Sequence, residues 1–188
     1  MIKVTLLGDS IRLIGYGTKV PELLGEEFEV FQPSDNCRYC KYTLRGLHDW
    51  KSDMEGSQIV HWNNGLWDVV RMFWDDPLTP LDVYVLMLER TYKRLKMLFP
   101  NARIIFATST SVIEEWGYED FMRYNSEIEQ YNAAAVAKME ELGVEVNDLY
   151  AITKDMGPEY RSDWVHYNQA GSEKLADAVV EKICNAWK

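Results

Sequence analysis

One serine and one Asp-x-x-His pair stand out as residues that could do chemistry together. Ser10 follows a short apolar run at the amino terminus, and His166 lies near the other end with Asp163 three residues before it. A serine hydroxyl is a weak nucleophile until a base takes its proton. A histidine is the natural base, and a neighbouring carboxylate can orient its ring and support its charged form. These three residues therefore predict an activated serine nucleophile.

The chain contains three histidines, and the other two are weaker candidates for the base. His48 falls on a predicted short helix beside Trp50, and His61 falls inside a predicted strand. The expected state of both is a satisfied, partly buried imidazole. His166, in contrast, lies in a predicted loop, where its ring can meet a reacting group.

The residues before Ser10 predict the strand that positions it. The run from Ile2 to Leu7 is short, mostly apolar and rich in β-branched residues, and Gly8-Asp9-Ser10 ends it with turn residues. Ligands of open α/β sheets bind at the carboxyl ends of the strands. Ser10 is therefore expected at the ligand-binding edge of a central strand.

The rest of the chain alternates between strands and helices. Strands are predicted over 28–31, 59–62, 103–107 and 144–146, and helices over 21–27 (the end of a helix), 43–53, 79–99, 126–142 and 172–187. In the third helix we expect Thr79 to act as the cap and five residues to form the apolar face: Val83, Leu86, Met87, Leu95 and Leu98. Between 65 and 80 lies a segment rich in tryptophan and aspartate, which we interpret as a functional loop.

Strict alternation predicts one α/β domain over residues 1–188. Its expected architecture is a three-layer α/β/α sandwich with a flavodoxin-like, parallel, five-stranded sheet in the order 2-1-3-4-5. The length of 188 residues and the 47% hydrophobic content suit one well-cored domain and are short for two.

The composition also restricts the classes of molecule that the protein is expected to bind. The net charge is −10, from 20 Lys and Arg against 30 Asp and Glu, which argues against binding to nucleic acid or to anionic membrane surfaces. Neutral or cationic ligands fit this balance better. No apolar run is long enough to span a bilayer, and the amino terminus is a core strand rather than a signal peptide. We therefore expect a cytoplasmic protein, with an export signal trimmed from the chain as the alternative.

The three cysteines do not form a disulfide framework, because their number is odd. Cys37 and Cys40 have the spacing of a zinc or redox pair, but no second Cys or His pair follows at ligand spacing. The expected state is ordinary thiols, with no metal and no cofactor.

Taken together, three motifs resemble the SGNH (GDSL-type) hydrolases, which are esterases and lipases of flavodoxin-like fold. They are Gly8-Asp9-Ser10 after the first strand, Asn63 or Asn64 after the third, and Asp163-Trp164-Val165-His166 before the last helix. The resemblance covers the whole chain. It implies that Ser10 is the nucleophile, that His166 is the general base and then acid, and that Asp163 orients His166.

The same resemblance implies an oxyanion hole, where the chain departs from the family pattern. The expected donors are the Ser10 backbone N–H, a backbone N–H of the second block and an asparagine side chain of the third. The second block usually supplies a glycine, but the loop here runs from Ser34 to Arg38 without one, so Cys37 or Asn36 must serve. The third block is usually Gly-x-Asn-Asp, whereas this chain has Asn63 and Asn64 before Gly65. Asn63 is preferred, because it is nearest to the strand end.

These departures resemble the branch of the family that acts on O-acylated carbohydrates. Aromatic faces stack on sugar rings, and four tryptophans are expected in the loops or at the strand end beside them: Trp62, Trp67, Trp74 and Trp164. The residues expected to contact substrate are Asp9, Asn36, Trp67 and Trp164. The resulting hypothesis is a serine esterase that removes short acyl groups, mainly O-acetyl groups, from a small-molecule or glycan ester.

Two other interpretations stay open. One is a lysophospholipase or lipase-type esterase of the same fold. The other is a non-catalytic, flavodoxin-like module in which the Ser10 loop holds a phosphate, although that loop lacks the repeated glycines of a phosphate cradle. The oligomeric state is left open by the sequence.

Overall fold

A parallel sheet of five strands forms the centre of the structure, a computed structural model that describes all residues, 1–188. The strands are β1 (Ile2–Leu7), β2 (Phe28–Phe31), β3 (Ile59–Asn63), β5 (Arg103–Ala107) and β7 (Glu145–Asn147). Their order is β2-β1-β3-β5-β7, and every pairing between neighbours is parallel. The predicted order 2-1-3-4-5 is therefore confirmed, with β5 and β7 as the fourth and fifth strands of the sheet.

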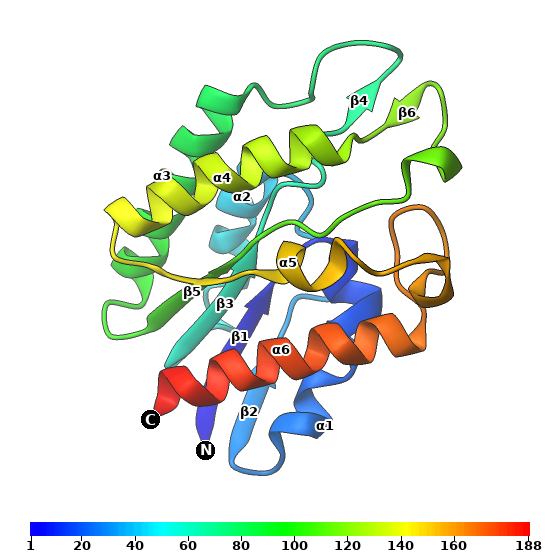
Figure 1. Ribbon diagram of the computed structural model, residues 1–188. Helices are drawn as coiled ribbons and strands as arrows, with labels where there is room; N and C mark the ends of the chain where they lie inside the picture. The colour runs from blue at the N-terminus through cyan, green and yellow to red at the C-terminus, as the bar shows by residue number, and fades with distance from the viewer.

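Helices cover both faces of the sheet, as Figure 1 shows. On one face lie α2 (Cys40–Trp50), α3 (Leu81–Leu98) and α4 (Asn125–Glu141), and on the other lie α1 (Val20–Leu24) and α6 (Gln169–Trp187). The short helix α5 (Leu149–Thr153) follows β7 and contacts α6. Crossover connections are right-handed, so a helix changes face when the chain changes direction across the sheet. The chain turns back at β2, which is why α1 lies opposite α2, α3 and α4.

The core is one continuous cluster of buried side chains around the central strands. All five residues of β3 are buried, which fits a strand covered by helices on both faces. Trp62 is completely buried in this strand, and its ring meets that of Phe106 edge-on at a centroid distance of 5.0 Å. The predicted strand 59–62 is confirmed and extends by one residue, to Asn63. Because Trp62 is completely buried in it, its ring is not available to stack on a sugar.

Helix α3 begins and packs differently from the prediction. Its N-cap is Pro80, and Thr79 makes no capping bond. Its buried residues are Tyr84, Met87, Leu88, Thr91 and Leu95. Leu86 is 52% exposed, because α3 packs against both α2 and α4 and the buried stripe is rotated from the predicted one.

A second, two-stranded sheet was not predicted. It pairs β4 (Arg71–Met72) with β6 (Phe121–Met122) in antiparallel orientation, and it projects beyond the main sheet near the top of Figure 1. Strands of two residues carry no detectable period in a sequence. This sheet brings the segment after β3 next to the segment before α4.

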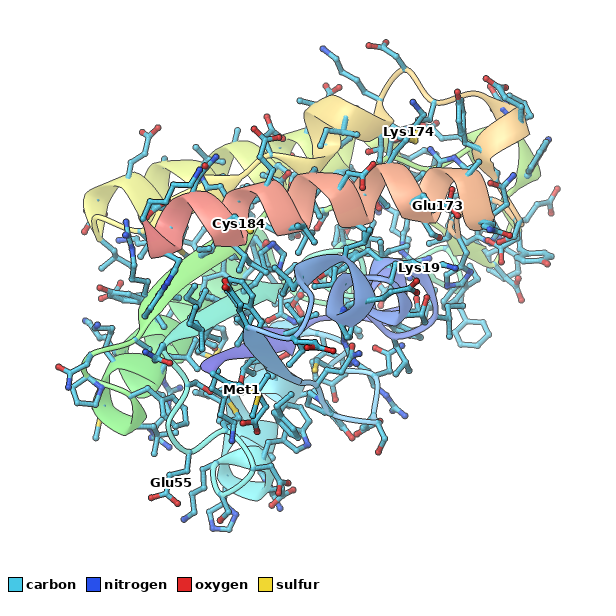
Figure 2. The ribbon with its side chains drawn as sticks, turned by 90° about the horizontal axis from the view of Figure 1, so that it is seen from below. Met1, Lys19, Glu55, Glu173, Lys174 and Cys184 are labelled. Atoms are coloured by element: carbon cyan, nitrogen blue, oxygen red, sulfur yellow. The ribbon has the colours of Figure 1, made fainter.

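Figure 2 looks at the molecule from below, with α6 running across the view from Glu173 and Lys174 towards Cys184. The helix begins at Gln169 rather than at the predicted residue 172, because the Asn168 side chain caps it by accepting from Gly171 N. All three cysteines are free thiols. No helix combines the length and the apolar character needed to cross a membrane.

Candidate active site

The Ser10 turn directly continues β1. The side chain of Asp9 accepts a hydrogen bond from the backbone N–H of Ile11 at 2.9 Å, and the chain then enters a π-helical turn, η1 (Ile11–Gly15). Single π-helical turns are frequent at functional sites. The backbone N–H of Ser10 has no hydrogen-bond partner, so it is free to donate to a ligand.

Ser10, His166 and Asp163 form one hydrogen-bonded chain, although Ser10 lies 156 residues from His166. His166 Nε2 lies 2.7 Å from Ser10 Oγ, and His166 Nδ1 lies 2.7 Å from Asp163 Oδ2. A carboxylate placed in this way favours the imidazole tautomer that leaves Nε2 able to accept the serine proton, so the geometry suits activation of Ser10 as a nucleophile. The side chains of His166 and Asp163 are 27% and 48% exposed, so the site opens to solvent.

Asp163 also shapes its own loop. Its Oδ1 accepts from the backbone N–H groups of Val165 and His166 at 2.8 and 2.7 Å. Burial raises the pKa of Asp163, but the hydrogen bonds from His166 and Val165 outweigh it, and the net pKa is lowered. Asp163 is therefore ionised at neutral pH and can stabilise a positively charged imidazole ring.

Arg12 ties the Ser10 turn to the loop after β2. This side chain is completely buried and donates to the carbonyl oxygens of Pro33 at 2.7 Å, Asp35 at 2.6 Å and Gly8 at 3.1 Å. The backbone N–H of Cys37 donates to the same Gly8 carbonyl at 3.1 Å. That N–H is already used, so Cys37 was wrong as a backbone donor of the oxyanion hole.

Asn36 shapes the same loop. Its Oδ1 accepts from the backbone N–H of Arg38 at 2.8 Å, and Arg38 adopts a positive φ of 48°. The side chain of Asn36 is half-buried. The hydrogen bond from Arg38 shows that Asn36 shapes the loop. Contact of Asn36 with substrate stays a prediction.

The two adjacent asparagines at the end of β3 have opposite environments. Asn63 is 3% exposed and packs on Gly8, where an added Cβ would come within 2.1 Å of Asn63 Oδ1. The Nδ2 of Asn63 has no hydrogen-bond partner and is not enclosed. The residue therefore presents a free amide donor beside the Ser10 turn.

Asn64 uses both ends of its amide within the protein. It accepts from Trp62 Nε1 at 2.7 Å and donates to the Arg38 carbonyl and to Thr43 Oγ1, both at 2.8 Å. Its amide has no donor left for a substrate, so the prediction that Asn64 is a possible oxyanion donor was wrong. Its contacts instead join the end of β3 to α2 and to the loop before it.

A second buried arginine, Arg161, holds the loop that carries His166. Arg161 donates to the carbonyl and hydroxyl oxygens of Ser111 at 2.8 and 2.7 Å, and its guanidinium lies 4.0 Å from the ring centre of Tyr167. The Tyr167 hydroxyl donates to the same Ser111 carbonyl at 3.0 Å. The polar segment after β5 thus anchors the His166 loop instead of facing the reacting atoms.

The four residues expected to contact substrate lie in different places. Asp9 is completely buried, and burial raises its pKa, so it supports the turn and cannot touch a substrate as predicted. Trp67 is partly exposed and Trp164 is 6% exposed. Both rings, together with Phe121, surround the guanidinium of Arg123 at 5.2 to 5.6 Å from its Cζ. For Trp67 and Trp164, contact with substrate stays a prediction.

Sequence reasoning missed the three arginines, Arg12, Arg123 and Arg161. Two of them had a positional signal: Arg12 lies two residues after Ser10, and Arg161 two residues before Asp163. Most arginines are exposed, so only the folded structure reveals that these three are buried.

The remaining candidate for chemistry was the pair Cys37 and Cys40. Both thiols are buried, and burial raises the pKa of each. No group of three or more His, Cys, Asp or Glu side chains is placed to hold a metal ion.

Comparison with known proteins places this arrangement in a structural context. No protein-family model and no curated protein sequence matches the chain. Among solved structures, an acetyl xylan esterase aligns with a TM-score of 0.76 and 19% identity over 97% of this chain and 100% of its own. The aryl esterase of M. smegmatis aligns with a TM-score of 0.80 and 15% identity over 98% and 99%.

A GDSL-like lipase from Bacteroides thetaiotaomicron aligns with a TM-score of 0.77 and 16% identity over 98% of this chain and 88% of its own. At these identities the likeness concerns the fold, and it extends over nearly the full length of each chain. The sheet order β2-β1-β3-β5-β7 with helices on both faces is common to them. The protein therefore has the fold of the SGNH, or GDSL-like, esterases, lipases and acylhydrolases.

Proposed function

We propose that this protein is a serine esterase that hydrolyses carboxylic esters through an acyl-enzyme intermediate. The observation that carries the proposal is the hydrogen-bonded chain from Ser10 Oγ through His166 to Asp163, with 2.7 Å at each link. These three residues lie on a fold whose structural neighbours include esterases and lipases. A phosphate-holding module would need neither a base on Ser10 nor a carboxylate behind that base.

The mechanism is a two-step acyl transfer. His166 Nε2 takes the Ser10 proton as Oγ attacks the ester carbonyl, and the ionised Asp163 stabilises the imidazolium that forms. The free backbone N–H of Ser10 and the free Nδ2 of Asn63 are the proposed donors to the oxyanion. His166 then protonates the leaving alcohol, and water hydrolyses the acyl-enzyme by the reverse transfer.

The proposed substrates are short acyl esters, mainly O-acetyl groups, on carbohydrates. One structural neighbour is an acetyl xylan esterase. That activity belongs to the neighbour and supports the choice of substrate here by analogy. The side chains of His166 and Asp163 are 27% and 48% exposed, so a substrate can reach them directly from solvent. An open site suits a short acyl group on a bulky alcohol.

A panel of 4-nitrophenyl acetate, butyrate and octanoate, together with an O-acetylated sugar, tests this proposal. We expect kcat/KM to fall from the acetate to the octanoate ester, and we expect acetate to be released from the sugar. A chelator should change neither the rate of 4-nitrophenyl ester hydrolysis nor that of acetate release. Faster turnover of octanoate would support the lipase-type interpretation instead. Failure of wild-type protein to hydrolyse any ester faster than Ser10→Ala would refute esterase activity.

A further inference from the structure

Arg123 is a buried cation with no carboxylate within ion-pair distance. The residue follows β6 and is 3% exposed, and the only hydrogen bond of its side chain runs from Nε to the Leu66 carbonyl at 2.5 Å. No carboxylate forms an ion pair with it. Its two terminal nitrogens are free but not enclosed, unlike the Nε atoms of Arg12 and Arg161, which are buried without a partner. Arg123 therefore offers the outer edge of its guanidinium to a ligand.

Arg123 lies between two loops that flank the proposed active site. Arg123 is held between the loop after β3, through Leu66 and the ring of Trp67, and the loop of Asp163, through the ring of Trp164. The first of these loops follows Asn63, the last residue of β3, and the second carries His166. The positive charge of Arg123 also lowers the pKa of Asp9, the residue before Ser10, although burial dominates that pKa. The contacts of the guanidinium with Leu66 and with Trp164 thus place it between the residues that follow Asn63 and the loop of His166.

The surroundings of Arg123 favour an anion over a neutral group. Burial lowers the pKa of Arg123 to about 10, whereas the attraction of Asp9 and Asp163 offsets this only in part. A buried charge is costly until it is paired, and a guanidinium matches a carboxylate with two parallel hydrogen bonds. Three aromatic rings around it, Trp67, Phe121 and Trp164, hold it in one orientation and keep water from its faces.

We propose that Arg123 is a specificity-determining residue that binds a carboxylate carried by the ester substrate. This inference rests on the proposed esterase function and names its substrate class, an ester that bears a carboxylate near the scissile bond. The net charge of −10 does not oppose it, because exposed charges are screened beyond roughly 10 Å whereas the buried Arg123 is not.

The test compares charged substrates with uncharged counterparts of similar shape. One arm puts the carboxylate on the acyl side: the 4-nitrophenyl monoester of glutaric acid against the same ester with its free acid methylated. The other arm puts it on the alcohol side: an O-acetylated methyl glucuronoside against the O-acetylated methyl glucoside. In one of the two arms, wild-type kcat/KM is expected to favour the charged substrate on the order of 10- to 100-fold.

The variant Arg123→Met should abolish that preference while hydrolysis of the uncharged ester continues. Arg123→Lys should keep part of the preference, because it retains the charge without the paired donors. Arg71→Met is the matched control, since it removes the same charge from β4, the strand that pairs with β6, where Arg71 forms an ion pair with Glu127 at 2.6 Å. It should leave the preference unchanged.

The proposal fails if wild-type protein shows no preference in either arm, or if Arg123→Met slows charged and uncharged substrates equally. Should Arg123→Met not fold, the wild-type preference and inhibition of uncharged-ester hydrolysis by glutarate still decide the question. If the wild-type protein hydrolyses esters but does not prefer the charged substrates, only the role of Arg123 is refuted and the esterase proposal stands. Loss of hydrolysis of every ester would instead refute the function itself.

Discussion

The two halves of the site are built in different ways. Ser10 follows the central strand β1 directly, and its turn is tied by the completely buried Arg12 to three backbone carbonyls. His166 lies in a loop between the short helix η4 (Pro158–Tyr160) and α6, away from any strand of the main sheet. That loop depends on hydrogen bonds to Asp163 and on Arg161. The sheet therefore positions the nucleophile, whereas a local network positions the base.

The strongest test of this comparison asks whether the two halves work as one unit. We expect Ser10→Ala and His166→Ala each to reduce kcat at least about 10,000-fold, with the double variant little slower than either. Steady-state kinetics on 4-nitrophenyl acetate measures it, and circular dichroism verifies the fold. Losses that multiply in the double variant would show that the two residues act independently.

The next test separates the two asparagines at the end of β3. Asn63→Ala should lower kcat on the order of 100- to 1,000-fold with little change in KM, because its free amide would act only in the transition state. Asn64→Ala removes partners of Trp62 Nε1, the Arg38 carbonyl and Thr43 Oγ1, so it should mainly lower stability. Kinetics and urea unfolding of both variants distinguish these effects. The reverse pattern would assign the donor to Asn64.

The third test compares the arginines that hold each half. Arg12→Met leaves three carbonyls without that donor, and we expect the free energy of unfolding to fall by about 3–5 kcal/mol. Arg161→Met leaves the Ser111 carbonyl still paired with Tyr167, so about 1–3 kcal/mol is expected. As a positioning residue, Arg161 should also affect kcat more than KM.

Arg161→Lys is the control, and it should restore part of kcat by keeping a donor to Ser111. Urea unfolding and steady-state kinetics of the three variants give both readouts. A larger stability loss in Arg161→Met than in Arg12→Met would contradict the view that the nucleophile half is the more tightly held.

The smallest expected effect is the dependence of stability on pH. A buried carboxyl near Ser10 and the carboxyl beside His166 should change stability in opposite directions as the pH rises. Asp68 is completely buried near the nucleophile half, where it accepts from the Cys40 backbone N–H, and burial raises its pKa to about 6. Its ionised form costs stability above that pH, on the order of 1–3 kcal/mol, and the cost disappears as the pH falls. Asp68→Asn should therefore stabilise the protein at pH 8 and change little at pH 4.

Asp163 should behave in the opposite way. Its folded-state pKa is lowered, so it contributes stability above its ordinary pKa and loses that contribution as the pH falls through the lowered value. Asp163→Asn should destabilise the protein at pH 8, with the difference from wild type shrinking in acid. Thermal unfolding of both variants from pH 4 to pH 8 measures the two slopes, and slopes of the same sign would refute the contrast.

The strands of the main sheet could be predicted because each is a short apolar run that ends in turn residues. The same logic located Ser10, and the spacing of Asp163 and His166 indicated a hydrogen-bonded pair. The β4–β6 sheet could not be predicted, since two-residue strands have no period and form only when distant segments meet. The exposure of Leu86 and the complete burial of the Trp62 ring were missed for a related reason: burial depends on which elements pack together.

What the sequence by itself determined is the α/β order, the parallel sheet and the residues that could make a nucleophile and its base, since these follow from local pattern and residue chemistry. Only the tertiary structure decided which donors are free. Asn63 and Asn64 are identical side chains on neighbouring positions, yet one amide is open and the other is fully bonded within the protein. The same holds for Arg12, Arg123 and Arg161, because a hydrogen-bond partner contributed by a distant segment exists only once the chain has folded.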